Sequence, residues 1–208
     1  MNIAIIPARG GSQRIPNKNR RLFHGKPIIA YSIQTALASR CFSKVYVSTD
    51  DAKIGAVARA YGAKIHHRPP PLARDEVGTQ EVTRAAIEWL LKCSLRYQEP
   101  PEFVCCIYPT APLMTAESIR AGLEILHSGH AQYVYTVGTN PRQDAGQWYW
   151  GRTQAFLDDA PLERDAGNVR FELPPERVCD INTEEDWARA EAMYQELQEC
   201  RVEEEARQ

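Results

Sequence analysis

Along the chain, short apolar runs alternate with longer stretches in which the apolar positions are three or four residues apart. Short apolar runs bounded by turn-forming residues are typical of buried strands, and longer stretches with apolar positions three or four residues apart are typical of amphipathic helices. The runs that predict strands are Asn2–Pro7, Val45–Ser48, Lys64–His66, Phe103–Tyr108 and Gln132–Val137. The stretches that predict helices are Pro27–Ser39, Ala52–Tyr61, Thr79–Leu95 and Thr115–His127.

This succession of strand and helix indicates an α/β fold. Parallel strands need crossover connections, and the helices in those connections cover the faces of the sheet. We therefore expect a mostly parallel sheet with helices on both faces. The chain has 208 residues, of which 43% are hydrophobic, and this is enough for one substantial core. We expect residues 1–208 to form a single domain.

The pattern becomes irregular over residues 138–175, where QWYWG (Gln147–Gly151) is the only clear strand. Because side chains alternate across a strand, its two tryptophans share one face, and Gln147 and Tyr149 share the other. One pair is expected to face the core and the other pair the cleft or a partner. Regularity returns with TEED at Thr183, which resembles a capping box and predicts a helix to about Glu199, followed by a frayed acidic end.

The charge and the cysteines narrow the class of protein. The formal net charge is −2, so no overall basic field favours nucleic acid or a membrane surface, and any anion site is local. Six cysteines show no CxxC pair, and no secretory or membrane-spanning run precedes them, so we expect reduced cysteines in a cytoplasmic protein. Adjacent Cys105 and Cys106 are expected to alternate across their strand. His66 and His67 are interpreted as packing residues rather than acid–base catalysts.

A glycine-rich loop directly follows the first predicted strand, in IIPARGGSQRIPNKNR (Ile5–Arg20), which contains no acidic residue. Open parallel sheets bind ligands at the carboxyl ends of their strands. Gly10 and Gly11 allow positive φ and close approach of the backbone, so successive amides can hold phosphate oxygens. The loop lacks both the Walker and the spaced-glycine patterns, which disfavours kinases and dehydrogenases. The alternative is a solvated basic turn. The cations of the loop are Arg9, Arg14, Lys18 and Arg20.

Carboxylates follow two further apolar segments. In VYVSTDD, one of Asp50 and Asp51 is expected to cap the next helix, while the other can face the cleft. In RVCDINTEEDW, Asp180 ends an apolar step just before a helix begins. Mg²⁺ prefers carboxylate oxygens and bridges to substrate phosphates, so Asp180 and the cationic loop together suggest a nucleoside triphosphate with its metal. The alternative role for Asp180 is local chemistry at the start of the helix.

Seven segments carry a resemblance over nearly the whole chain: IIPARGGSQRIPNKN, AYSI, VYVSTDD, YGAKIHHRP, YPTAP, DAGQWYWG and RVCDINTEEDW. In this order they resemble the acylneuraminate cytidylyltransferase family, the CMP-sugar synthetases. The resemblance implies a Rossmann-like nucleotidyltransferase that uses Mg²⁺ to join CTP to an acidic nine-carbon sugar and releases pyrophosphate. It also implies a homodimer. DAGQWYWG and YPTAP are most similar to the members of the family that act on pseudaminic acid.

The resemblance also implies roles for individual residues. The residues expected at the nucleotide are Ala8, Arg9, Gly10, Gly11, Ser12, Lys18, Asn19, Arg68, Thr79, Pro109 and Thr110. Gln147 and Tyr149 are expected beside the sugar, and Asp180 and Asn182 at the metal. Of all these, the resemblance implies that Lys18, Arg9 and Asp180 are catalytic.

Three departures from the family pattern leave alternatives open. Asn182 stands where the family usually has an aspartate, Gln13 stands where lysine is common, and the segment around residues 138–175 is shorter than the excursion that the family uses for dimer contacts and the sugar-side wall. One alternative is therefore a non-catalytic nucleotide-binding homologue. Another is a synthetase for a different acidic sugar, namely N-acetylneuraminic, legionaminic or 3-deoxy-octulosonic acid.

Overall fold

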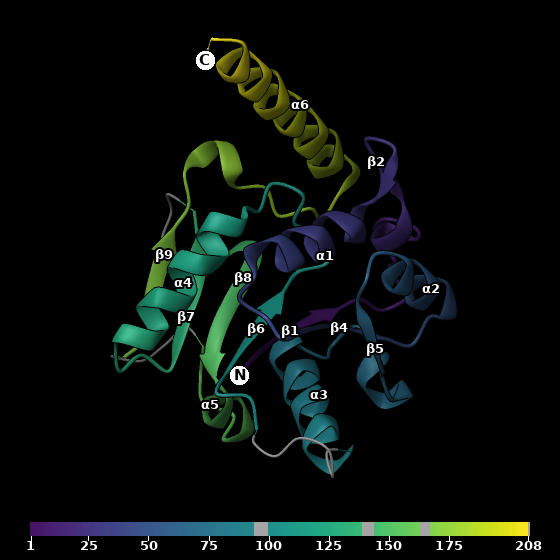
Figure 1. Ribbon diagram of the computed structural model, residues 1–208. Helices are drawn as coiled ribbons and strands as arrows, with labels where there is room; N and C mark the ends of the chain where they lie inside the picture. Colours follow the sequence, from purple (N-terminus) through teal and green to yellow (C-terminus); the bar gives the residue numbers. More distant parts are fainter. Residues whose placement is uncertain (94–99, 139–143, 163–166, 208) are drawn as a thin grey trace.

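A seven-stranded sheet forms the centre of the computed structural model, which describes residues 1–93, 100–138, 144–162 and 167–207 (Figure 1). In spatial order, its strands are β5 (Lys64–His67), β4 (Lys44–Thr49), β1 (Asn2–Pro7), β6 (Phe103–Ile107), β8 (Asp144–Arg152), β7 (Tyr133–Val137) and β9 (Val169–Glu172). A separate two-stranded ribbon pairs β2 (Leu22–Phe23) with β3 (Lys26–Pro27).

The sheet is mostly parallel, as predicted. Strands β5, β4, β1 and β6 run parallel to one another, and β9 is parallel to β7. Only β8 is antiparallel to its two neighbours. The carboxyl ends of β1, β4 and β6 therefore lie side by side along one rim of the sheet. The segments that follow these strands are brought together there.

Helices cover both faces of the sheet, which confirms the expected α/β architecture. On one face lie α1 (Ile28–Ser39), α2 (Ala52–Ala60) and α4 (Ala116–Ser128), and on the other lie α3 (Thr79–Cys93) and α5 (Thr153–Leu157). Three short 3-10 turns are η1 (Lys18–Arg20), η2 (Pro70–Ala73) and η3 (Pro175–Arg177). Cys105 and Cys106 are both fully buried and belong to the cores on opposite faces, as the strand alternation predicted.

The segment expected to be irregular is more regular than its pattern indicates. In addition to β8, it contains the helix α5 and the edge strand β9. Strand β9 was missed because it is mostly exposed and only four residues long, too short for the alternation of Val169 and Phe171 with polar residues to be a clear signal; pairing with β7 makes it a strand. The segment after Gly138, which the sequence analysis found shorter than in the family, lies largely outside the described part of the chain.

Most of β8 is buried on both faces. The expectation that one residue pair faces a cleft or a partner is therefore wrong for Tyr149, which lies in the core, whereas Gln147 lines a small cavity. Trp148 and Trp150 pack under α4, and their indole N–H groups donate to Ser118 Oγ (3.2 Å) and the Ile119 carbonyl (3.0 Å). Tyr149, on the opposite face, is 1% exposed because α3 and α5 cover it.

The last helix, α6 (Glu184–Ala206), stands apart from the sheet in Figure 1. It begins at the predicted capping box: the Asp186 amide donates to Thr183 Oγ1 (3.2 Å), and the Thr183 amide donates to Asp186 Oδ2 (2.9 Å). Its first turns pack Trp187 against Phe23 of the ribbon. The helix does not fray after Glu199, since good helix formers continue to Ala206. Among the described residues, no helix has the length and apolarity to cross a membrane.

Candidate active site

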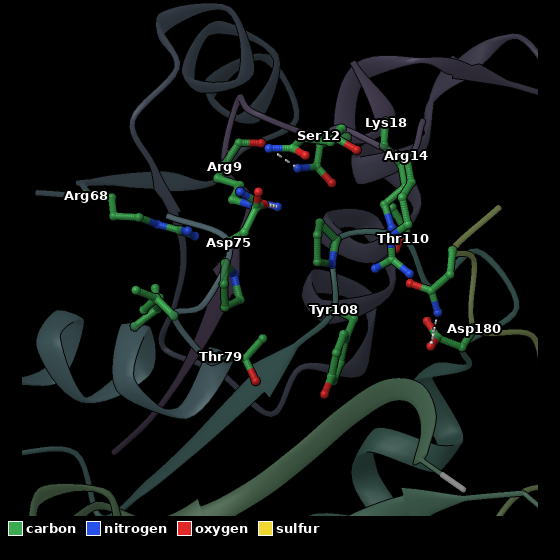
Figure 2. Close-up of a pocket in the computed structure, with 17 residues that line it drawn as sticks. Arg9, Ser12, Arg14, Lys18, Arg68, Asp75, Thr79, Tyr108, Thr110 and Asp180 are labelled. Atoms are coloured by element: carbon green, nitrogen blue, oxygen red, sulfur yellow. Dashed lines mark hydrogen bonds and ion pairs between the residues drawn. The ribbon is translucent and has the colours of Figure 1, made fainter. Parts of the chain in front are cut away.

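A cavity of about 540 Å³ opens at the sheet edge where β1 and β6 end (Figure 2). It is lined by eight of the residues expected at the nucleotide: Arg9, Ser12, Lys18, Asn19, Arg68, Thr79, Pro109 and Thr110. Asp180 and Asn182, expected at the metal, also line it. The structure thus brings the loop after β1 and the segment before α6 to one cavity, although Lys18 and Ile181 are 163 positions apart along the chain.

The glycine loop is folded back over the cavity by two internal anchors. The Asn19 side chain is buried and donates from Nδ2 to the Arg9 carbonyl at 2.9 Å, which ties the two ends of the loop together. Ile15 is fully buried in the same small core as Trp187. These anchors hold the polar side chains of the loop toward the cavity.

The two acidic residues after β4 hold the loop and the next helix. Asp51 caps α2, as one of the pair was predicted to do, and its Oδ1 accepts from the amides of Lys53 (2.6 Å) and Ile54 (3.2 Å). Asp50 Oδ1 accepts from the Gly10 amide at 3.0 Å. A Cβ at position 10 would lie 2.9 Å from Asp51, so the glycine allows the loop to pack closely against the start of α2.

Three of the residues expected at the nucleotide do not line the cavity in this structure. Ala8 is fully buried, and its amide donates to the Ser48 carbonyl at 2.9 Å. The Gly10 amide is bonded to Asp50, and Gly11 lies outside the cavity wall. The loop therefore faces the cavity with its side chains more than with its glycine amides.

Arginines gather at one end of the cavity. Arg9 forms an ion pair with Asp75, which comes from the loop between η2 and α3 (Figure 2). Arg68 is 7% exposed and donates to the Ser48 carbonyl at 2.8 Å. Burial lowers the pKa of Arg68 to about 10, with the nearby Asp50 carboxylate acting in the opposite direction. Arg68 is therefore still a cation at neutral pH, held rigidly in a desolvated wall.

Lysine and carboxylate meet at the other end. Lys18 Nζ donates to the Ile181 carbonyl at 2.6 Å, and Asn182 Nδ2 donates to Asp180 Oδ2 at 2.5 Å. Burial lowers the pKa of Lys18, while Asp180 raises it, and the cationic side chains of Arg14 and Arg9 add to the lowering. Lys18 thus lies where an added anion would relieve repulsion between cations.

The residues at this end fit a divalent cation that is bound mainly through a substrate. Mg²⁺ in nucleotide sites is typically held by one or two carboxylates together with phosphates and water. Asp180 supplies one carboxylate, and Asn182 has an amide oxygen. The described ranges contain no group of three or more His, Cys, Asp or Glu that could hold a metal. The donor set fits an ion that arrives with a triphosphate rather than one held by protein side chains alone.

The two residues expected beside the sugar lie apart from the large cavity. Gln147 lines a second cavity of about 280 Å³, together with Leu113, Phe171 and Arg177. Its Nε2 donates to the Arg177 carbonyl at 2.6 Å, while its buried Oε1 has no hydrogen-bond partner in the described part of the chain. Tyr149 is buried and reaches the large cavity only indirectly, through its hydroxyl bond to Thr79 Oγ1 (3.1 Å).

Sequence reasoning missed several residues of the large cavity, among them the polar residues Asp75 and Tyr108. Tyr108 directly follows β6, so the rule that located the loop after β1 also applied to it. Asp75 lies in an irregular loop with no periodic signal, and it meets Arg9 only through the tertiary structure. Arg14, noted above among the loop cations, also lines the cavity.

Comparisons with known proteins show which family this chain is similar to. A protein-family model described as cytidylyltransferase matches residues 3–145. The chain is 33% identical to the pseudaminic acid cytidylyltransferase of Campylobacter jejuni subsp. jejuni serotype O:2, with 93% of this chain and 96% of that protein covered. It is 42% identical to the CMP-N,N'-diacetyllegionaminic acid synthase of Legionella pneumophila subsp. pneumophila, over a match that covers 59% of this chain and 52% of that relative.

The fold is likewise shared with solved structures. The structure of a CMP:2-keto-3-deoxy-manno-octonic acid synthetase complexed with CTP superposes with a TM-score of 0.70 at 15% identity, covering 94% of this chain and 98% of that one. At this level of identity, the likeness concerns the architecture alone.

Proposed function

The chain belongs to the cytidylyltransferase family, and from this premise we propose that it transfers CMP from CTP to a nonulosonic sugar, with pseudaminic acid as the acceptor. The anomeric hydroxyl oxygen of the sugar attacks the α-phosphorus. The bond from that phosphorus to the bridging oxygen breaks, pyrophosphate leaves, and the hydroxyl proton is released. The products are a CMP-sugar and pyrophosphate.

One observation carries this proposal. Arg9, Lys18 and Arg68 line a single cavity at the sheet edge where parallel strands end, and Asp180 lies on its wall. A triphosphate is the ligand class whose charge suits several fixed cations, and a carboxylate beside them suits the accompanying metal. The net charge of the chain is −2, so this cationic cavity is a local feature rather than the result of a basic protein.

Catalysis by these residues is a matter of position and charge. Phosphoryl transfer spreads negative charge over the equatorial and leaving oxygens, so groups that are already fixed near those oxygens stabilise the transition state. We assign Lys18 to the α- and β-phosphate oxygens, and Arg9 and Ser12 to the remainder of the triphosphate. Asn19 Oδ1 is buried without a partner among the described residues, which supports a contact with a donor group of the nucleotide.

The metal is assigned to the Asp180 end of the cavity. Asp180 would hold it together with substrate phosphates, with Asn182 beside it, and a bound divalent cation would neutralise charge on the phosphates. Asn182 contributes no negative charge, so the protein supplies less charge to the metal than an aspartate pair would.

The part of the acceptor remote from its anomeric hydroxyl is assigned to the second cavity, because the hydroxyl itself must reach the α-phosphorus in the large cavity. The unpartnered Gln147 Oε1 supports this assignment, because a hydroxyl or amide N–H of the sugar would satisfy it. Gln147 is also joined to the first cavity, since its carbonyl accepts from the amide of Tyr108 at 2.8 Å. The homodimer implied by the resemblance remains a proposal, and a mass of 23.5 kDa by light scattering would contradict it.

Pyrophosphate release with CTP, Mg²⁺ and pseudaminic acid tests the proposed reaction. We expect turnover by the wild type and a loss on the order of 100-fold in Lys18→Ala, because a fixed cation at the developing charge is removed. Lys92→Ala is the matched control, since it removes an exposed lysine at the end of α3. Full turnover in Lys18→Ala would contradict the assigned role of that lysine.

The same assay separates the alternatives. Binding of CTP by calorimetry without pyrophosphate release, with every acidic sugar tested, would favour a non-catalytic homologue. Release with N-acetylneuraminic, legionaminic or 3-deoxy-octulosonic acid, and not with pseudaminic acid, would keep the reaction and change the acceptor.

A further inference from the structure

The Asp180 carboxylate lies against a residue of β8 that has no side chain. Gly146 has a φ of +66°, and a Cβ built on it would lie 2.8 Å from Asp180 Oδ1 and 3.0 Å from Asp180 Cγ. Distances this short do not persist between real atoms, so Asp180 occupies the space that any side chain at position 146 would need. The absence of a side chain at 146 therefore determines how closely the carboxylate approaches β8.

Gly146 is itself held in place from the cavity side. Its amide donates to Asp144 Oδ1 at 2.9 Å, and the other oxygen of Asp144 accepts from the Tyr108 hydroxyl at 2.7 Å. Tyr108 lines the large cavity. A chain of contacts thus runs from the cavity wall through Tyr108 and Asp144 to Gly146, and from Gly146 to Asp180.

The two oxygens of Asp180 have different surroundings. Oδ2 accepts from Asn182 Nδ2 at 2.5 Å, while Oδ1 is the oxygen that faces Gly146. Oδ2 can keep this bond and still bind a metal through its second lone pair, but the carboxylate is restrained on one side by Asn182 and on the other by Gly146. Small displacements of the carboxylate then matter, since it must reach an ion whose position is also set by the substrate phosphates.

We propose that Gly146 is a positioning residue for the metal-binding carboxylate: its missing side chain lets Asp180 lie against β8, in the place where Asp180 binds the divalent cation that accompanies the triphosphate. This inference rests on the proposed function. It assigns to the DAGQWYWG segment a role in metal binding that is separate from the acceptor role proposed for Gln147.

The variant Gly146→Ala tests this role, with Gly25→Ala as the matched control. Gly25 also has a positive φ, +83°, but a Cβ there would meet nothing within 4 Å. Both variants therefore carry the same kind of backbone strain, and only the first displaces Asp180. Asp180→Asn serves as the reference for loss of the metal-binding carboxylate.

The measurement is the affinity for CTP by calorimetry, once in EDTA and once with Mn²⁺, and the readout is the ratio of the two dissociation constants. We expect Gly146→Ala to shift this ratio from the wild-type value by roughly tenfold, as Asp180→Asn does, with little change in EDTA. Gly25→Ala should keep the wild-type ratio. Combining Gly146→Ala with Asp180→Asn should add no further change, because both act on one group.

A wild-type ratio in folded Gly146→Ala would overturn the inference, and so would a full additional loss in the double variant. If Gly146→Ala does not fold, Asp144→Ala carries the test, since it frees the Gly146 amide and so loosens the backbone against which Asp180 lies. A wild-type ratio in that variant would overturn the positioning role of Gly146. Failure of the proposed function is distinguishable, because the wild-type chain would then bind CTP in neither buffer.

Discussion

At the scale of single residues, two of the cations that line the cavity already have partners in the protein. Arg9 is paired with Asp75, and Lys18 donates to the Ile181 carbonyl. These contacts keep the cations in the cavity wall at low cost in side-chain entropy when the nucleotide binds. The Arg9–Asp75 pair is partly exposed, so its own contribution to stability is small.

His66 is buried and packed inside the protein, as expected from the sequence. It is 2% exposed, its Nδ1 lies 3.0 Å from Ser48 Oγ, and its ring packs 5.0 Å from that of Trp89. Burial lowers the pKa of His66 to about 4, and the cationic Arg68 and neighbouring His67 act in the same direction. The folded protein therefore keeps this imidazole neutral.

The buried imidazole predicts how stability depends on pH. In the unfolded chain, His66 is protonated near its ordinary pKa of about 6.5, whereas in the folded chain it is protonated only near pH 4. The contribution of neutral His66 to the free energy of unfolding is therefore complete above pH 6.5 and is lost as the pH falls toward 4. We expect His66 to lower the free energy of unfolding by up to about 3 kcal/mol as the pH falls from about 6.5 to about 4. Urea unfolding across the range, in the wild type and in His66→Gln, measures it. An equal pH slope in both proteins would contradict the prediction.

At the scale of elements, α4 approaches β8 through a glycine. A Cβ at Gly122 would lie 2.6 Å from Trp148 Cζ3 and 2.9 Å from Trp150 Cδ1, so the indole rings occupy the place of a side chain at this helical position. The same rings bond to Ser118 and Ile119 of α4. The helix and the strand are therefore fixed to each other both by shape and by hydrogen bonds.

Two alanine substitutions at helical glycines should have opposite effects. Gly122→Ala is expected to lower the free energy of unfolding by about 2 kcal/mol, because overpacking against two rigid rings exceeds the gain in helix propensity. Gly55→Ala in α2 meets only ordinary contacts, at 3.8 and 3.9 Å, and is expected to raise it by about 0.5–1 kcal/mol. Denaturant unfolding measures both. A stabilising Gly122→Ala would refute the proposed close packing.

At the scale of the whole molecule, charge is distributed unevenly. The chain as a whole has a net charge of −2, yet the large cavity gathers Arg9, Arg14, Lys18 and Arg68. Under the proposed function, the attraction between these cations and CTP is local and acts over the short distance that salt leaves unscreened. It opposes the weak repulsion between CTP and the net negative charge of the chain.

This arrangement predicts that the dissociation constant of a ligand depends on salt only if the ligand carries phosphates. Raising the ionic strength from about 50 mM to about 500 mM should raise the dissociation constant for CTP by roughly tenfold, because the cavity is open to solvent and its cations are screened. Cytidine, which has the base and ribose without phosphates, is the matched control and should change little. Equal salt dependence for both ligands in calorimetry would contradict a phosphate site in this cavity.

The elements that the sequence predicted well are those with a strong local signal. The strand Asn2–Pro7 and the helix start at Thr183 follow from apolar spacing and from a capping box, and both were placed correctly. Strand β9 was missed because its extended conformation depends on hydrogen bonding to β7, which is distant along the chain. Asp75 was missed for the same reason, since its partner Arg9 lies far from it along the chain.

The sequence by itself determined the α/β architecture, the glycine loop after the first strand and the carboxylate before the last helix. These follow from spacing within a few residues, and spacing of that kind acts on the chain locally. Only the tertiary structure decided that Tyr149 is buried, that Asp180 packs against Gly146, and that the Gly10 amide donates to Asp50. Those contacts depend on which surfaces meet once the sheet and its helices have packed, and a local pattern does not specify them.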